Sequence, residues 1–154
     1  MDEISKIANE LHRYRDHDVE TKIKQYLLLQ GPRDLSSISG QLSLTDLEVL
    51  SEINPEGDSS LSQLVSNSTL SQGAVSKIIA KLGRLSLLTK YHHADNKKES
   101  YVKLSASGKR IQQYHAAYHQ MMDARTQRLA EKYTHDQLIL IADFIARVND
   151  LRES

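Results

Sequence analysis

The stretch TLSQGAVSKIIAKLGRLSLLTKYHHADNKKESYVKLSASG, from Thr69 to Gly108, is the most basic part of the chain. Residues 71–110 hold nine Lys and Arg against two Asp and Glu, a net +7, although the 154-residue chain is neutral. Residues 1–70 hold six against twelve (−6), and residues 111–154 hold five against six (−1). A local field of one sign steers anionic partners even when the total charge is zero. By charge alone, this segment is either a solvated basic face or a binding surface.

The first part of this stretch predicts an amphipathic helix that begins after Ser71, a favourable N-cap residue. Its apolar residues recur at helical spacing and share one face: Ala74, Val75, Ile78, Ile79, Leu82 and Leu85. The opposite face is small, polar and basic: Gln72, Gly73, Ser76, Lys77, Ala80, Lys81 and Arg84. The helix should therefore bury one face and present the other to a partner.

The second part predicts a β-hairpin. After the helix the apolar period changes from about 3.6 to about 2, and Leu87–Tyr91 and Ser100–Leu104 are short strand candidates. The polar residues HHADNKKES between them include the turn formers Asp95 and Asn96. We expect a hairpin with a long, basic tip.

Two shorter helices are expected before this stretch. Ser43 is a candidate N-cap for a helix that carries Leu44, Leu47, Leu50 and Ile53, and Ser60 for one with Leu61, Leu64 and Val65. A polar turn at residues 67–69 then leads to Ser71. Helix, turn, amphipathic helix and basic hairpin is the order of a winged helix-turn-helix. This predicts a DNA-binding lobe at about residues 43–104.

Both ends of the chain predict long amphipathic helices, one over Asp2–Leu29 and one from Ala106, after the cap Ser105, to Lys132. Within the first, the polar residues RDHDVETK (15–22) are expected to form either a solvated stretch or a bend. Thr134 and Gln137 have the spacing of a capping box that starts a final helix. Residues 33–41 are expected to be a short helix or loop. The expected fold class is mostly α, an α+β winged helix-turn-helix in a single domain over residues 1–154, with six helices and a small β-hairpin.

The composition excludes several classes of protein. There is no Cys, so disulfides, thiol nucleophiles and Cys-based zinc fingers are excluded. No apolar run approaches the ~20 residues of a membrane span, and the polar N-terminus is unlike a signal peptide. P-loop, GxSxG, HExxH and dinucleotide-binding motifs are missing. We expect a cytoplasmic protein that is not an enzyme and has no membrane partner.

The outer face of the helix after Ser71 suits the major groove of DNA, which is about 12 Å wide. Gly73, Ser76 and Ala80 leave room for close approach. Ser71, Gln72 and Lys77 are expected to reach base edges, and Lys81 or Arg84 to reach phosphates. The basic hairpin tip is expected to contact the DNA backbone or the adjacent minor groove.

Three segments together resemble the MarR (multiple-antibiotic-resistance regulator) family of bacterial transcription factors: LSLTDLEVL, SLSQLVSNSTLSQGAVSKIIAKLGRLSLLTK and DNKKESYVKLSASGK. The resemblance implies that Asp95 orients the wing and that Asn96, Lys97 and Lys98 contact DNA. The family usually has Asp-x-Arg here, so Lys97 keeps the positive charge without the planar fork of arginine. Ser86 stands where the family commonly has Gly, and Ser105 where it commonly has Thr.

The resemblance also implies a homodimer whose dimerisation helices come from residues 1–30 and 106–154. Two recognition helices about one DNA turn apart would then read a pseudo-palindromic operator in double-stranded DNA. The implied function is a transcriptional regulator that acts as a repressor, responds to a small-molecule effector and requires no cofactor.

A metal site is an alternative, because His115 and His119 have the i, i+4 spacing that places two histidines on one helix face. They could equally be polar residues of a dimer helix. A zinc-sensing branch of the family carries histidines at similar positions, and by this resemblance Glu48 is a third candidate ligand. His17 and Glu20 are candidates for a fourth. Tyr114 and Tyr118, which interleave with the histidines, could instead line a pocket for an aromatic effector.

A function of another class, a winged-helix module that docks on a protein, is weighed against DNA binding. Such a module would more often expose apolar residues on the outer face of its second helix. Here that face is polar and basic.

Overall fold

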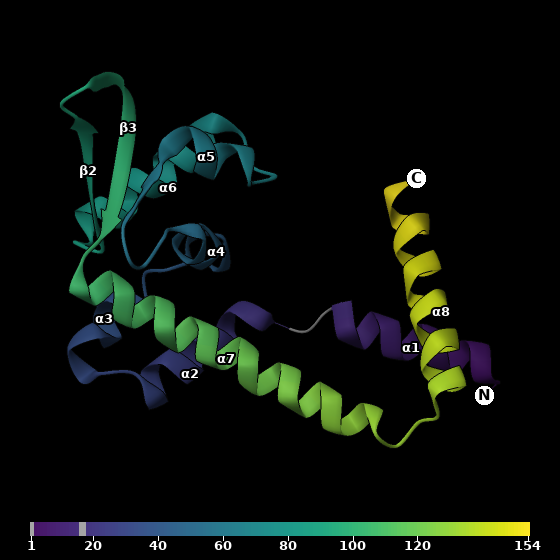
Figure 1. Ribbon diagram of the computed structural model, residues 1–154. Coiled ribbons are helices and arrows are strands. Elements are labelled where there is room, and N and C mark those ends of the chain that lie inside the picture. Colours follow the sequence, from purple (N-terminus) through teal and green to yellow (C-terminus); the bar gives the residue numbers. More distant parts are fainter. Residues whose placement is uncertain (1, 16–17) are drawn as a thin grey trace. The chain divides into compact units, whose positions relative to one another are not determined.

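The computed structural model describes residues 2–15 and 18–154, and these contain eight α-helices, one 3-10 turn and three strands (Figure 1). The sequence-based expectation of six helices was therefore wrong. In chain order the elements are α1 (Glu3–Arg15), α2 (Val19–Gln30), η1 (Arg33–Leu35), α3 (Ser36–Ser39), α4 (Leu44–Glu52), β1 (Asp58–Ser60), α5 (Leu61–Ser66), α6 (Gln72–Arg84), β2 (Leu88–His93), β3 (Asn96–Leu104), α7 (Ala106–Ala130) and α8 (His135–Glu153).

The two additional helices lie before the winged helix-turn-helix. The single helix expected over Asp2–Leu29 is two helices, because the Asp18 carboxylate accepts a hydrogen bond from the backbone N–H of Thr21 at 2.9 Å. This is an N-cap interaction, and it starts α2 as a separate helix. The other addition is the single turn of α3, within the segment expected to be a short helix or loop.

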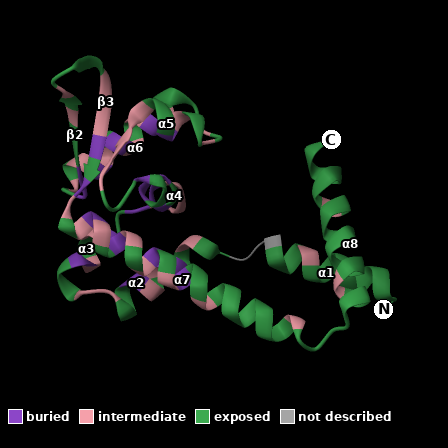
Figure 2. Cartoon of the chain, in the orientation of Figure 1, coloured by how far each residue is buried: buried purple, intermediate pink, exposed green. Residues whose placement is uncertain are grey.

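The chain divides into two compact units, the first ending at Ala116 and the second running from Ala117 to Ser154. In the first unit, α4, α6 and the base of the hairpin enclose an aliphatic core (Figure 2). The start of α7 joins this core through Ile111, and the Gln112 side chain donates to the Leu50 and Ile53 carbonyls at 3.0 and 2.8 Å. Core residues that are at most 2% exposed include Leu47, Leu50, Ile53, Val75, Ile79, Leu82, Leu87, Val102 and Ile111.

The sheet has three antiparallel strands in the order β1-β3-β2, with Ser60 opposite Tyr101 and Tyr91 opposite Tyr101. β1 was not expected, because its short polar sequence follows Gly57 and is typical of a turn. The hairpin also differs from the expectation of a long tip. His93 pairs with Asn96, so only Ala94 and Asp95 form the turn, and the basic residues lie on strands.

The second unit contains the end of α7 and the whole of α8. The capping box expected at Thr134 and Gln137 is confirmed, with reciprocal hydrogen bonds of 2.8 and 3.2 Å. No described residue of α8 is buried, and Figure 2 shows the helix almost entirely in the exposed colour. In the described part of the chain, no helix has both the length and the apolar character needed to cross a bilayer.

The recognition-helix candidate α6 ends in a Schellman motif. The N–H of Ser86 donates to the Gly83 carbonyl and the N–H of Leu87 to the Leu82 carbonyl, each at 3.0 Å. Ser86 adopts a φ of +59°, in the left-handed region that favours glycine. Leu82 and Leu87, both fully buried, provide the apolar contact that accompanies this motif. Serine therefore carries strain at a position where the resembled family commonly has glycine.

Replacing Ser86 by Gly should raise the free energy of unfolding by about 0.5–1 kcal/mol. Relief of the left-handed strain, about 1–2 kcal/mol, should outweigh the extra freedom that glycine adds to the unfolded chain. Urea unfolding at neutral pH measures the change. The control is Ala80→Gly on the exposed face of α6, which should lower stability by about 1 kcal/mol. A loss of stability in the Ser86 variant would contradict the assignment of strain.

Candidate nucleic-acid interface

Helix α6 buries one side and exposes the other, as the sequence predicted. The Ser71 hydroxyl accepts from the N–H of Ala74 at 3.2 Å, which confirms the predicted N-cap. Val75, Ile79 and Leu82 are the buried residues of the helix, while Ile78 is only half-buried because it lies at the edge of the apolar stripe. The residues expected to face DNA lie on the outer side: Ser71, Gln72, Gly73 and Lys77 are exposed and Ser76 is half-buried.

A shallow basic hollow lies on this outer face. It has a volume of about 350 Å³ and is lined by Lys77, Ile78, Ala80, Lys81 and Arg84. The methyl side chain of Ala80 leaves space between the three cationic side chains. Such a hollow can accept a phosphate group or a base edge, because it combines positive charge with room for close approach.

Lys81 has a second role that the sequence did not reveal. Its Nζ lies 2.5 Å from Oδ2 of Asp46, whose side chain is 5% exposed. The Asp46 carboxylate also accepts from the N–H of Ser43 at 2.9 Å, while the Ser43 hydroxyl accepts from the N–H of Asp46 at 3.1 Å, so α4 starts with a capping box. Ser43 followed three residues later by Asp46 was the available signal. The ion pair joins the start of α4 to the recognition-helix candidate.

The electrostatic balance at Asp46 follows from these contacts. Burial by itself would raise the pKa of the Asp46 carboxyl, but the hydrogen bond from Lys81 and the Ser43 N–H outweigh it and hold this pKa below its ordinary value of 3.8. The carboxylate is therefore charged at neutral pH, and Lys81 neutralises it.

The wing presents its lysines to solvent. Asp95, Asn96, Lys97 and Lys98 are all exposed, and in the part of the chain that the structure describes neither Lys97 nor Lys98 forms an ion pair. The Asn96 side-chain oxygen accepts from the backbone N–H groups of Lys98 and Glu99 at 3.2 and 3.3 Å, which holds the turn. Both cations are thus available to an anionic partner.

An aromatic and acidic cluster holds the three strands together, and sequence reasoning did not find it. His93 stacks on Tyr101 with ring centroids 3.5 Å apart and lies 2.8 Å from the Asp58 carboxylate, to which the Tyr91 hydroxyl also donates. These hydrogen bonds, that of Tyr91 first, lower the pKa of Asp58, and the same bond raises the pKa of Tyr91. Tyr91 and His93 are two positions apart on β2, so their side chains lie on the same face of the sheet.

The wing is also attached to the helix-turn-helix at α5. The Glu99 carboxylate accepts from the backbone N–H of Ser62 at 3.2 Å and from its hydroxyl at 2.6 Å, and these bonds lower the pKa of Glu99. The exposed His92 contacts the Glu99 carbonyl at 2.8 Å through Nδ1. The basic strand therefore has a defined position beside α5.

The candidate metal ligands are not assembled into a three-donor site. Within residues 2–15 and 18–154, no group of three or more His, Asp or Glu side chains is placed to hold a metal ion. His115 on α7 is 3% exposed, whereas His119 on α7 and Glu48 on α4 are exposed. Glu20 pairs with Lys24 at 2.9 Å, and His17 lies outside the described residues. Of the two candidate effector-pocket residues, Tyr118 is buried and Tyr114 half-buried.

A helix-turn-helix with a polar, basic second helix, followed by an antiparallel hairpin that is attached to it, defines a winged helix-turn-helix protein. Residues 42–100 match the family described as MarR family.

Individual similar proteins agree with this assignment. The chain is 28% identical over 99 residues to the uncharacterized HTH-type transcriptional regulator YhjH of Bacillus subtilis (strain 168), covering 64% of this chain and 57% of YhjH. The fold matches Lactococcus lactis ZitR, a zinc-responsive MarR family member, with a TM-score of 0.63, 20% identity and coverage of 71% of this chain and 76% of ZitR. It also matches Streptococcus pneumoniae FabT in complex with DNA, with a TM-score of 0.67, 14% identity and coverage of 98% of both chains.

Replacing Asp46 by Asn should lower the free energy of unfolding at pH 7 by about 1–2 kcal/mol, because Lys81 loses its ionic partner. Since the folded pKa of Asp46 lies below 3.8, its contribution is complete above that pH and is lost as the pH falls through the folded pKa. The variant should therefore lose less stability than the unmodified protein on acidification.

Urea unfolding between pH 7 and pH 3 measures this difference. The matched control is Asp34→Asn, which removes an exposed ion pair with Arg110 and should change stability by less than about 0.5 kcal/mol. Identical acid dependence in the Asp46 variant and the unmodified protein would refute the role of this carboxylate.

Proposed function

We propose that this chain is a homodimeric, sequence-specific DNA-binding transcriptional regulator that acts as a repressor, and not an enzyme. The observation that carries the proposal is the exposed outer face of α6, from Ser71 to Arg84, beside a wing whose Lys97 and Lys98 form no ion pair with any described residue. The face is polar and basic, and its small residues permit close approach to a groove.

The similar proteins support the same function. YhjH is an HTH-type transcriptional regulator by name, and FabT has a structure with DNA bound. Because a bacterial regulator acts on the chromosome, the proposal places the protein in the cytoplasm.

A second copy of the chain is the expected cover for the apolar residues at the two chain ends, within residues 1–30 and 106–154. On α1, Ile4 and Tyr14 are each 80% exposed, and on α8 Leu140 is 69% and Leu151 76% exposed. Large exposed apolar faces favour association. Sedimentation velocity tests the dimer, and a purely monomeric species at micromolar concentration would contradict it.

Docking of the helix-turn-helix on another protein is less well supported. The apolar residues of α6 face its own core, and three cationic side chains line its outer hollow. An interface core between proteins is normally depleted of charge.

Replacing Lys97 and Lys98 together by Ala should weaken binding to specific and random DNA alike. Each lost phosphate contact removes the release of about 0.9 counterion, so the slope of log K against log salt should become shallower by about 1–2. Fluorescence anisotropy titrations at several salt concentrations measure the slope. Lys132→Ala, outside the proposed interface, is the control, and a slope unchanged in the double variant would refute the wing contact.

Replacing Gln72 or Lys77 by Ala should reduce discrimination between the operator and random DNA by roughly 1–3 kcal/mol if a bidentate base contact is lost. The operator is first selected from a random duplex library with the unmodified protein. The ratio of the two dissociation constants is then compared for each variant. Equal losses on both DNAs would show that these side chains position the protein without reading bases.

Zinc sensing is a second candidate function, favoured by the fold match to the zinc-responsive ZitR and by two histidines on α7. The described residues do not supply three donors, so His115, His119 and Glu48 would need further ligands. If zinc binds, isothermal calorimetry on chelator-treated protein should give a dissociation constant below the millimolar range that His119→Ala weakens by at least about tenfold. Lack of binding, or binding unaffected by His119→Ala, would eliminate this function.

A further inference from the structure

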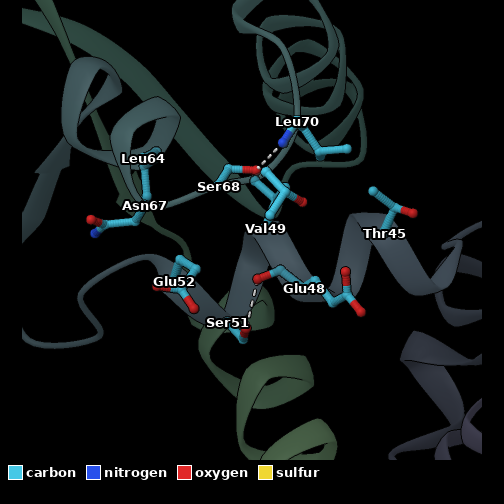
Figure 3. A pocket seen from close by; sticks show the side chains of 10 residues that line it. Thr45, Glu48, Val49, Ser51, Glu52, Leu64, Asn67, Ser68 and Leu70 are labelled. Atoms are coloured by element: carbon cyan, nitrogen blue, oxygen red, sulfur yellow. Dashed lines mark hydrogen bonds between the residues drawn. The ribbon is translucent and has the colours of Figure 1, made fainter. Parts of the chain in front are cut away.

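A concave site lies behind the turn that precedes the recognition-helix candidate. It has a volume of about 310 Å³ and is formed by one face of α4, the end of α5 and the turn that follows (Figure 3). This volume is within the range of small-molecule sites. All of its lining residues lie between Thr45 and Leu70. Of the candidate zinc ligands, the site contains Glu48 but neither histidine of α7.

The site combines an apolar surface with negative charge. Val49, Leu64 and Leu70 supply the apolar part, and Glu48 and Glu52 line the same concavity. The i, i+4 spacing of the two glutamates puts them on one face of α4, next to Val49. In the part of the chain that the structure describes, neither glutamate forms an ion pair, and no lysine or arginine lines the site.

We propose that this site binds a small organic cation, an ammonium group attached to an apolar or aromatic body. The ammonium would lie between the carboxylates of Glu48 and Glu52, which form no ion pair with any residue that the structure describes. The apolar body would contact Val49, Leu64 and Leu70. An anionic ligand of the same size would meet two like charges and no compensating cation.

The position of the site couples it to the proposed DNA contact, and this part rests on the proposed function. Leu70 immediately precedes the N-cap Ser71, and the N–H of Leu70 donates to the Ser68 hydroxyl at 3.0 Å. A bound cation cancels negative charge beside the start of α6, where the polyanion would approach. It should therefore strengthen DNA binding, and DNA should strengthen binding of the cation by the same factor.

The test is a ¹⁵N-NMR titration of the full chain in the presence of a chelator, with benzyltrimethylammonium as the probe. Benzoate and benzyl alcohol, which share the ring, serve as anionic and neutral comparisons. We expect saturable shifts for the cation at amides of α4 and of residues 68–70. Glu48→Gln/Glu52→Gln should weaken this binding by roughly five- to tenfold, whereas Glu56→Gln, an exposed glutamate outside the site, should change it by less than about twofold.

Three results would overturn the site: shifts that do not saturate, shifts centred on other elements, or equal binding of benzoate. An affinity unchanged in Glu48→Gln/Glu52→Gln would overturn the role of the carboxylates.

Anisotropy with the selected DNA then tests the coupling, at constant ionic strength, with and without saturating probe. We expect DNA affinity to rise several-fold with the probe; an unchanged or lower affinity would overturn the coupling. If the chain binds no DNA at all, the proposed function fails, while the NMR titration still decides the cation site.

Discussion

The structure depends on one constraint: α6 must bury one side firmly enough to hold its other side in a fixed orientation. Val75, Ile79 and Leu82 achieve this on the core side, at exposures of 0–2%. An apolar contact alone resists sliding and rotation poorly, because it is non-directional. The ion pair from Lys81 to the buried Asp46 adds a directional link to α4, and the left-handed residue Ser86 ends the helix at one position. Together they fix how the helix is rotated and where it stops.

The position of the wing depends in turn on where α6 ends. Leu87 is buried directly after the end of α6, so the hairpin leaves the core at a defined point. Two polar attachments then set its direction, the Asp58 cluster across the sheet and the Glu99 carboxylate on Ser62 of α5. The acidic side chains Asp58 and Glu99 thus hold the wing in position within the basic lobe. Lys97 and Lys98 near the tip pair with none of the residues that the structure describes, so their positive charge faces solvent.

Charge is distributed to match these roles. The outer face of α6 and the wing are basic, whereas α4 presents Glu48 and Glu52 in a concavity behind the turn. A regulator that must bind one polyanion in one orientation gains from such asymmetry, because negative charge elsewhere discourages other orientations. The same asymmetry makes the concavity suitable for a cation. The recognition surface and a site able to modulate it would then be separated by the single turn from Asn67 to Leu70.

Local features of the fold were predictable from sequence, because each rests on interactions between residues close in the chain. Caps at Ser43, Ser60, Ser71 and Thr134 and the amphipathic period of α6 belong to this group. A bend within residues 15–22 was one of two expectations, but α2 was not predicted as a separate helix, because the apolar stripe resumes beyond Asp18. β1 was missed because three polar residues become a strand only when β3 lies beside them. The predicted hairpin tip was longer than the observed two-residue turn. The strand ends near the tip are solvated and lack the alternation of apolar residues by which a strand is predicted.

By itself, the sequence determined the order of helix, turn, helix and hairpin, because this order follows from local periodicity. It also determined that positive charge is concentrated in these elements, because this follows from local composition. Only the tertiary structure decided which charges are available to a partner. Lys81 is joined to an aspartate 35 positions away, and Glu99 to a serine 37 positions away, while Lys97 and Lys98 form no ion pair within the described part of the chain. Pairings at such separations depend on how the elements pack, and packing is a property of the whole core that local spacing does not encode.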